Sequence, residues 1–157
     1  MMTSDLKIAE GGFSSDRKAE VPGFILERTA RRMKQFFQEQ LAAAGTDITI
    51  DQWVILQELD RRGGCSQQDL ALATFKDAPT VTRIIDLLCK KGLTRRQPDD
   101  EDRRRFRVEL TAEGRDKIDR TMPLVRDCRR EVWQVLTEEE VDRLVGMLNR
   151  VFEHLKD

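Results

Sequence analysis

The feature that most constrains the fold is a change in the spacing of apolar residues between positions 78 and 110. Between Val81 and Leu88 the apolar residues recur at steps of three and one, as on one side of a helix, and Gly92 ends this pattern. From Phe106 to Leu110 apolar and charged residues alternate, which is typical of a half-buried strand. The segment therefore predicts a helix followed by strand structure.

The strand partner of Phe106–Leu110 is expected at Leu93 to Gln97. Between the two runs lies a polar turn that begins with Pro98 and contains four acids and two arginines. Two short runs joined by such a turn predict a two-stranded hairpin with a charged tip.

A second short helix is expected before this unit. Ser66 precedes Gln67-Gln68-Asp69, so its hydroxyl can cap a helix that covers Gln67 to about Thr74. Asp77 stands before Ala78-Pro79, and proline is tolerated in a first helical turn, so the next helix begins there. Two helices separated by a few residues predict a helix-turn-helix.

Longer helices flank this unit on both sides. Apolar residues at helical spacing predict one helix from Phe24 to a stop at Gly45, and a shorter one from about Thr49 or Asp51 to Leu59. Thr111 should cap a long helix that reaches about Val135 and bends at Pro123. Thr137 and Glu140 form a capping box for the last helix.

The last helix carries a broad apolar stripe that needs a partner. Its members are Val141, Leu144, Val145, Leu148, Val151, Phe152 and Leu155. Large exposed apolar patches mark interfaces, so we expect a homodimer held together by Leu144, Leu148, Val151 and Phe152.

Composition indicates one folded domain without catalytic machinery. The chain has 157 residues, 39% of them hydrophobic, and a formal net charge of -1. No apolar run has the length of a signal peptide core or a membrane span, so we expect a cytoplasmic protein with no membrane partner. His154 is the single histidine, and no phosphate-binding loop or nucleophile elbow occurs. We expect no catalytic residue, no metal, no cofactor and no enzymatic activity.

The three cysteines are expected to be free thiols. Cys65, Cys89 and Cys128 are odd in number and widely spaced, which fits neither a disulfide framework nor a structural zinc site. Cys89 is expected in the core. Cys128 lies among arginines, so it is the best candidate of the three for an oxidation-sensing thiol. A packing role is nevertheless favoured for all three cysteines.

Charge is segregated along the chain. The segment from Lys76 to Arg107 holds ten basic and six acidic residues, so it is positive while the remainder is negative. Phosphate neutralisation supplies affinity for a duplex while one helix enters the major groove. Together with the order helix, helix, strand, turn, strand, this charge favours DNA binding over a solvated charged hairpin.

Several motifs in this region resemble the MarR family of winged-helix transcriptional regulators. The stretch from Pro79 to Leu88, followed by Lys90-Lys91-Gly92-Leu93, resembles the family's recognition helix and its exit. Asp102-Arg103-Arg104, with Leu110-Thr111 and Gly114 beyond it, resembles the wing motif. The resemblance covers about Phe24 to Leu155. It implies a dimer on a pseudo-palindromic operator, with release by a small aromatic or phenolic effector.

The expected organisation is therefore mainly α-helical, with a winged helix-turn-helix and a helical dimerisation region from both ends of the chain. Residues 1–20 are expected to form a flexible arm and 21–157 a single MarR-like domain. Within it, about 50–110 form the DNA-binding lobe, and about 23–45 and 111–157 the dimerisation region.

Candidate contacts follow from the motifs. The predicted DNA-binding residues are Ser66, Gln67, Gln68, Lys76, Thr80, Thr82, Arg83, Arg103 and Arg104. Arg83 is the preferred base reader, because arginine can fork onto guanine O6 and N7, while an ion pair with Asp86 is the alternative. Ser66 can meet a phosphate or simply cap its helix.

At the tip of the hairpin we favour Arg104 for insertion into a minor groove, with Asp102 orienting its guanidinium. The four consecutive acids from Asp99 to Asp102 leave the depth of insertion open.

Where the family resemblance places effectors, the apolar residues Met33, Phe36, Phe37 and Trp53 are the expected lining of a pocket, with plain core packing as the alternative.

The function that these patterns favour is a sequence-specific double-stranded DNA-binding transcriptional regulator, most simply a repressor that blocks a promoter. The alternative is a helical interaction module that binds another protein through its apolar last helix and does not bind nucleic acid.

Overall fold

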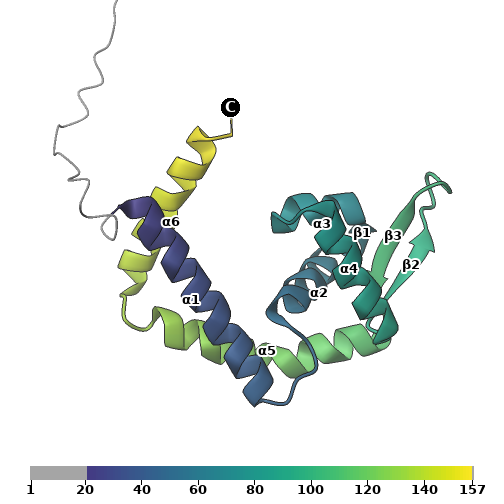
Figure 1. Cartoon of the computed structure of the whole chain (residues 1–157), viewed down its shortest axis with the longest axis horizontal. Coiled ribbons are helices and arrows are strands. Elements are labelled where there is room, and N and C mark those ends of the chain that lie inside the picture. Colours follow the sequence, from purple (N-terminus) through teal and green to yellow (C-terminus); the bar gives the residue numbers. More distant parts are fainter. Residues whose placement is uncertain (1–20, 157) are drawn as a thin grey trace, which may run out of the picture. The chain divides into compact units, whose positions relative to one another are not determined.

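The computed structural model describes residues 21–156, which form six α-helices and a small three-stranded sheet (Figure 1). In chain order the elements are α1 (Pro22–Ala43), α2 (Ile50–Arg62), β1 (Cys65–Ser66), α3 (Gln67–Thr74), α4 (Ala78–Lys90), β2 (Thr94–Pro98), β3 (Phe106–Leu110), α5 (Ala112–Trp133) and α6 (Glu138–His154). The expected mainly helical winged helix-turn-helix fold is confirmed. The predicted arm at residues 1–20 lies outside the described residues.

The chain divides into two compact units, one ending at Gln35 and the other beginning at Phe36. The boundary between the units falls inside α1, which is one continuous helix. The apolar spacing of this helix does not predict such a boundary. All elements from α2 to α6 belong to the second unit, which therefore contains the whole helix-turn-helix and the hairpin.

The core of the second unit lies between α2, α3, α4 and the sheet. Leu56, Leu70, Ile85 and Val108 each contribute a side chain with 0% exposure. Leu56, Leu70 and Ile85 come from helices and Val108 from the alternating strand, so the apolar spacing that favours each element also supplies the surface that it buries. Figure 1 shows α3 and α4 side by side with α2 behind them.

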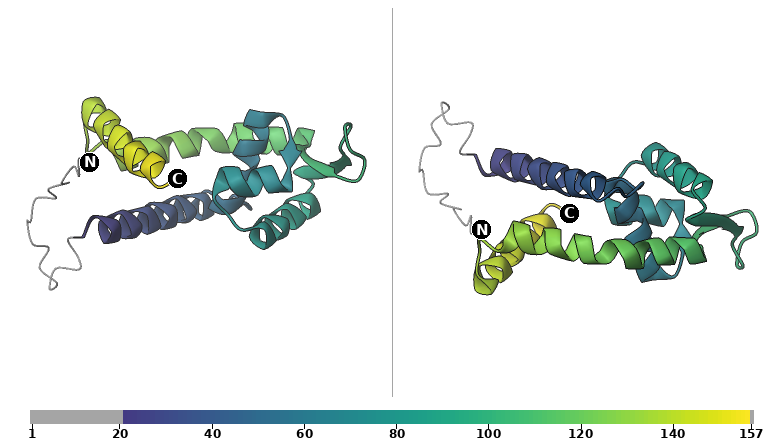
Figure 2. Two further views of the ribbon diagram at one scale, coloured as in Figure 1. Left: turned by 90° about the horizontal axis from the view of Figure 1, so that it is seen from above. Right: turned by 90° about the horizontal axis from the view of Figure 1, so that it is seen from below.

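The sheet has one strand more than the sequence predicts. Its order is β1-β3-β2 with antiparallel pairing throughout, and Cys65 pairs with Val108. A strand of two residues has no alternation of apolar and polar side chains, so periodicity does not reveal β1. Pro98 does not begin the turn as the sequence predicts, but is the last residue of β2 and lies opposite Phe106. A proline is tolerated there because β2 is an edge strand of the sheet. The hairpin of β2 and β3 projects beyond α2, α3 and α4 in both views of Figure 2.

The junction between the hairpin and α5 explains the spacing of the wing motif. Thr111 caps α5 by accepting the N–H of Gly114 over 3.0 Å, and its hydroxyl donates to the Gly92 carbonyl over 2.6 Å. Gly114 lies so close to Leu93 that a Cβ atom there would be 2.1 Å from the Leu93 carbonyl oxygen. The helix can therefore approach the end of α4 only with glycine at this position.

The last helix has the predicted capping box and, within the described residues, a largely exposed apolar face. The Thr137 N–H donates to Glu140 Oε2 over 2.9 Å, and the Glu140 N–H donates to Thr137 Oγ1 over 3.2 Å. No residue of α6 is buried, and Val151 is 56% exposed. No helix within residues 21–156 is both long and apolar enough to cross a bilayer.

Candidate nucleic-acid interface

The two helices of the helix-turn-helix are capped as the sequence predicts. Ser66 accepts the N–H of Asp69 over 3.1 Å and donates its hydroxyl to the Asp69 carboxylate over 2.8 Å. Asp77 caps α4 by accepting the N–H of Thr80 over 2.9 Å, and this bond lowers the pKa of the Asp77 carboxyl below its ordinary value. Phe75, with φ of 52°, makes the left-handed turn that separates the helices. Both helix starts are thus held by charged or hydroxyl caps.

The exposed side of α4 leaves one predicted base-contacting side chain available. Thr80 donates its hydroxyl to Asp77 over 2.8 Å, and Thr82 donates to the Ala78 carbonyl over 3.0 Å. Arg83 is exposed and forms no salt bridge or hydrogen bond with any other described residue. Arginine is the side chain best suited to fork onto guanine. Arg83 is therefore positioned to meet a partner outside the chain.

The ion pair considered between Arg83 and Asp86 does not form. Asp86 instead accepts a hydrogen bond from Arg96 of β2 over 2.6 Å. The Nε of Arg96 also donates to Gln67 over 2.9 Å, and Gln67 donates to Thr82 over 3.0 Å. This network, Thr82–Gln67–Arg96–Asp86, joins α3, α4 and β2 into one surface. Sequence reasoning misses the role of Arg96, because its partners lie far away along the chain.

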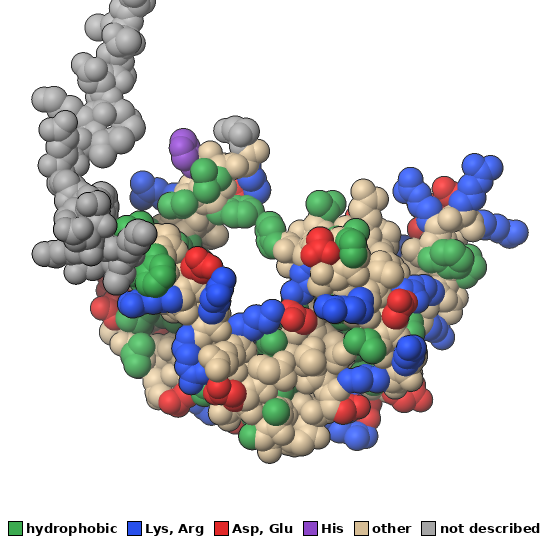
Figure 3. All heavy atoms as spheres, in the orientation of Figure 1, with side chains coloured by type: hydrophobic (Ala, Val, Ile, Leu, Met, Phe, Trp, Pro, Cys, Tyr) green, Lys and Arg blue, Asp and Glu red, His purple; other side chains and the backbone are tan. Residues whose placement is uncertain are grey.

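The hairpin tip is organised by Asp102. Asp102 accepts the backbone N–H of Arg104 over 3.0 Å, and its carboxylate lies 3.7 Å from Nε of Arg105. Among the described residues the Asp102 carboxylate thus contacts the backbone of Arg104 and the side chain of Arg105, and it forms no ion pair with the Arg104 guanidinium. That Asp102 orients Arg104 on DNA stays a prediction. The side chains of Arg103 and Arg104 are exposed, and Figure 3 shows basic side chains projecting from this loop.

The remaining predicted DNA contacts differ in availability. Gln68 is exposed beside Ser66 at the start of α3. Lys76 is 18% exposed and pairs with Asp51 of α2 over 2.6 Å, which makes it the least available of the predicted residues. Its charge is already compensated inside the lobe.

The four expected pocket residues have different surroundings. Trp53 is 2% exposed within the core, and Phe37 packs against that core. Phe36 meets Phe37 edge to face, with ring centroids 6.0 Å apart, and lines a recess of about 370 Å³ together with Gln40, Leu124 and Cys128. Met33 belongs to the first unit. For Trp53 and Phe37 the packing role is the one that the structure shows.

The cysteines are free and mostly shielded. Cys65 and Cys128 are buried, and burial raises the pKa of both thiols, which disfavours the reactive thiolate. Cys89 is half-buried, with its sulfur 3.3 Å from the Thr94 hydroxyl. The surroundings of Cys65 and Cys128 are those of packing residues.

Comparison with known proteins agrees with this geometry. The profile of the MarR family matches residues 48–106, which span α2 to the hairpin. The HTH-type transcriptional repressor IacR of Pseudomonas putida is 29% identical over 140 residues, covering 89% of this chain and 83% of IacR. The chain belongs to the MarR family.

Solved structures of MarR-family proteins have the same fold. Escherichia coli MarR in complex with operator DNA superposes with a TM-score of 0.76 at 27% identity, covering 82% of this chain and 91% of that one. BpsR of Bordetella bronchiseptica, whose DNA binding is regulated by 6-hydroxynicotinic acid, superposes with a TM-score of 0.78 at 28% identity, covering 85% and 94%. The MarR-family relatives found are transcriptional regulators.

Proposed function

We propose that this protein is a sequence-specific double-stranded DNA-binding transcriptional regulator of the MarR type, and that it acts as a repressor. The observation that carries this proposal is the exposed guanidinium of Arg83 on α4, which forms no salt bridge or hydrogen bond with a described residue and lies next to the network that ties α4 to β2. Recognition helices contact base edges through the residues of their early turns. Membership of the MarR family supports the same conclusion.

In this proposal α4 reads the major groove and the hairpin reaches the neighbouring minor groove. Arg83 contacts base edges, while Thr82, Gln67 and Gln68 support α4 or meet phosphates. Arg104, exposed at the tip, enters the minor groove, where the potential is most negative. Arg103 and Arg105 then lie beside the backbone as further positive charges.

We also propose that the regulator is a homodimer on a pseudo-palindromic operator. Among the described residues the apolar face of α6 is largely exposed, with Leu148 at 37% and Phe152 at 42% exposure, although the Phe152 ring also meets Phe75 edge to face with centroids 5.6 Å apart. A second copy of the same helix would cover the exposed part of this face. The alternative, an interaction module that uses this face to bind an unrelated protein, has no support in the exposed arginines of α4 and the hairpin.

A small aromatic acid is the effector class that we propose, because a structural relative is regulated by 6-hydroxynicotinic acid. Such a ligand must bind the DNA-incompetent form more tightly, with a coupling of about 1–3 kcal/mol. Titrating a panel of aromatic carboxylates and phenols into the protein–operator complex tests this. Binding without any change in operator affinity would contradict the effector proposal and leave DNA binding untouched.

The experiment that tests the main proposal begins with selection of bound fragments from genomic DNA, followed by affinity measurements on the selected duplex and a scrambled one. We expect the selected duplex to contain an inverted repeat and to bind about 10³-fold or more tightly than the scrambled duplex. Equal affinity for both duplexes, or no binding to either, would contradict sequence-specific regulation.

A further inference from the structure

A second group of arginines lies outside the predicted DNA contacts. The end of α2, the start of α3 and strand β3 enclose an open recess of about 710 Å³. Four arginines line it, accompanied by two carboxylates: Arg61, Arg62, Arg105, Arg107, Asp69 and Asp99. We call it the arginine recess.

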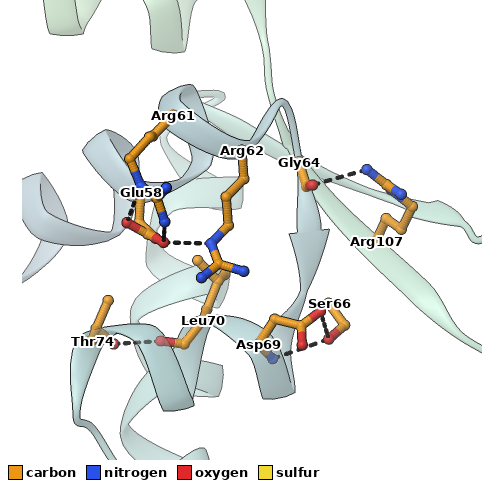
Figure 4. A network of polar contacts seen from close by, with 9 residues as sticks. All are labelled: Glu58, Arg61, Arg62, Gly64, Ser66, Asp69, Leu70, Thr74 and Arg107. Carbon is orange, nitrogen blue, oxygen red and sulfur yellow. Dashed lines mark hydrogen bonds and ion pairs between the residues drawn. The ribbon is translucent and has the colours of Figure 1, made fainter. Parts of the chain in front are cut away.

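Two of these arginines are held in place by one acid. Glu58 accepts hydrogen bonds from Arg61 over 2.6 and 3.1 Å and a further one from Nε of Arg62 (Figure 4). The hydrogen bond from Arg61, together with that from Arg62, lowers the pKa of Glu58, so this carboxylate stays ionised at neutral pH. The two side chains therefore lose less conformational freedom when they bind an anion.

The arginine recess keeps unused donors. Arg62 donates to Glu58 through Nε, and its two terminal nitrogens have no hydrogen-bond acceptor among the described residues. Arg107 donates through Nη2 to the Gly64 carbonyl over 2.8 Å, and its other nitrogens are likewise available.

The carboxylates of the recess have partners of their own. Asp69 accepts the Ser66 hydroxyl over 2.8 Å, and Asp99 accepts the N–H of Glu101 over 2.9 Å. Four arginines and two carboxylates line the recess, while Glu58 and Asp102 pair with three of these arginines from outside the lining. The residues that line the recess therefore carry a net positive charge, and their remaining N–H donors suit an anionic ligand.

The position of the recess indicates which anion. It is bordered by Ser66, which caps α3, by Gln68 in the first turn of α3, and by Arg105 near the hairpin tip. In a helix-turn-helix complex the first helix crosses the sugar–phosphate backbone while the second lies in the major groove. The backbone that crosses the start of α3 beside the wing would thus pass over these arginines.

We propose that the arginine recess binds backbone phosphates of the DNA duplex, next to the bases that α4 reads, and adds affinity without sequence preference. The inference rests on the proposed function, since it requires that α4 and the hairpin face DNA. It assigns a role to Arg62 and Arg107, which come from segments that sequence motifs do not connect.

The test uses the full-length Arg62→Gln and Arg107→Gln variants, singly and together, with Arg120→Gln as the matched control. Arg120 is an exposed arginine of α5 paired with Asp116, so its substitution removes the same charge outside the recess. Affinity for the selected and scrambled duplexes is measured from low to high salt. Removing one arginine–phosphate pair should reduce the slope of log affinity against log salt by about 0.9 per protomer, equally on both duplexes.

Phosphate ethylation interference locates the bound phosphates. In the wild type, ethylation of backbone phosphates beside the wing should block binding, and the double variant should be insensitive at those same phosphates. Arg107→Lys keeps the charge and should retain the salt slope. Because Arg107→Gln also removes the bond to Gly64, thermal unfolding is compared, and the exposed Arg62→Gln variant alone decides if the double variant does not fold.

The outcomes separate the two proposals. If the wild type binds its selected duplex and the recess variants have the salt slope and interference pattern of Arg120→Gln, the recess inference is overturned and the proposed function stands. If the wild type binds no duplex, both are overturned. A decrease in affinity confined to the selected duplex would also overturn the inference, because phosphate contacts carry no sequence information.

Discussion

Replacing Arg83 by alanine should separate DNA recognition from stability more cleanly than any other change in α4. The side chain is exposed and has no salt bridge or hydrogen bond with a described residue, so its removal leaves no buried group unsatisfied. Surface substitutions of this kind change the free energy of unfolding by less than about 0.5 kcal/mol. Any large effect on DNA binding is then a direct effect of the missing guanidinium.

The expected size of that effect follows from the geometry of base recognition. A bidentate arginine–guanine pair contributes about 1–3 kcal/mol of discrimination. In a dimer on two equal half-sites both protomers lose this pair, so the binding free energy should fall by about 2–6 kcal/mol in total. This corresponds to a decrease in operator affinity of about 30-fold to 20,000-fold. Affinity for scrambled DNA should barely change, since base contacts add little there.

Fluorescence anisotropy with labelled operator and scrambled duplexes measures both affinities, and urea unfolding of the same samples measures stability. Arg104→Ala serves as the contrasting variant. It should weaken binding most where A·T-rich sequence flanks the half-sites and should flatten the salt dependence by about one counterion. Wild-type affinity of both variants on both duplexes would refute the assignment of α4 and the hairpin tip to DNA.

Three other changes test the scaffold around this surface. Gly114→Ala places a Cβ atom 2.1 Å from the Leu93 carbonyl oxygen and should destabilise the protein by about 1–3 kcal/mol or more in urea unfolding; an unchanged midpoint would contradict the close approach of α5. Leu148→Asp combined with Phe152→Asp should convert the dimer to monomer in analytical ultracentrifugation, and a folded wild-type monomer at low micromolar concentration would remove the dimer proposal. The lowered pKa of Asp77 means that its contribution to stability is present above its ordinary pKa of 3.8 and is lost as pH falls through the lower folded-state value. Asp77→Asn keeps a capping side chain but has no carboxyl group to protonate, so its stability should fall less than that of the wild type between pH 5 and pH 3. Thermal unfolding at both pH values measures the two losses, and equal losses would contradict a contribution from the charged cap.

Local features of the fold follow from the sequence because their partners are near neighbours. Ser66, Asp77, Thr111 and Thr137 each cap the helix that starts directly after them. The strand Phe106–Leu110 has the predicted limits because its alternation is a local pattern. Short-range hydrogen bonds and apolar spacing are written in consecutive residues, so one sequence is enough to read them.

The candidate site follows from the sequence only in part. Arg83 and Arg104 are exposed as predicted, because their positions on a helix and a turn follow from local patterns. Lys76, in contrast, is paired with Asp51, 25 positions before it. Such a pairing depends on how α2 packs against the helix-turn-helix, which no local pattern describes.

The sequence by itself determined the order of helices and strands, their caps and the side of each helix that is apolar. Only the tertiary structure decided which polar groups meet: Arg96 bonds to Asp86 and Gln67, and Asp102 pairs with Arg105. It also decided that Arg62 and Arg107 line one recess. The physical reason is range. A cap or an apolar stripe is satisfied within one or two helical turns, whereas a guanidinium at the end of a long side chain can bond to any acceptor that packing brings within reach, and packing is a property of the whole core.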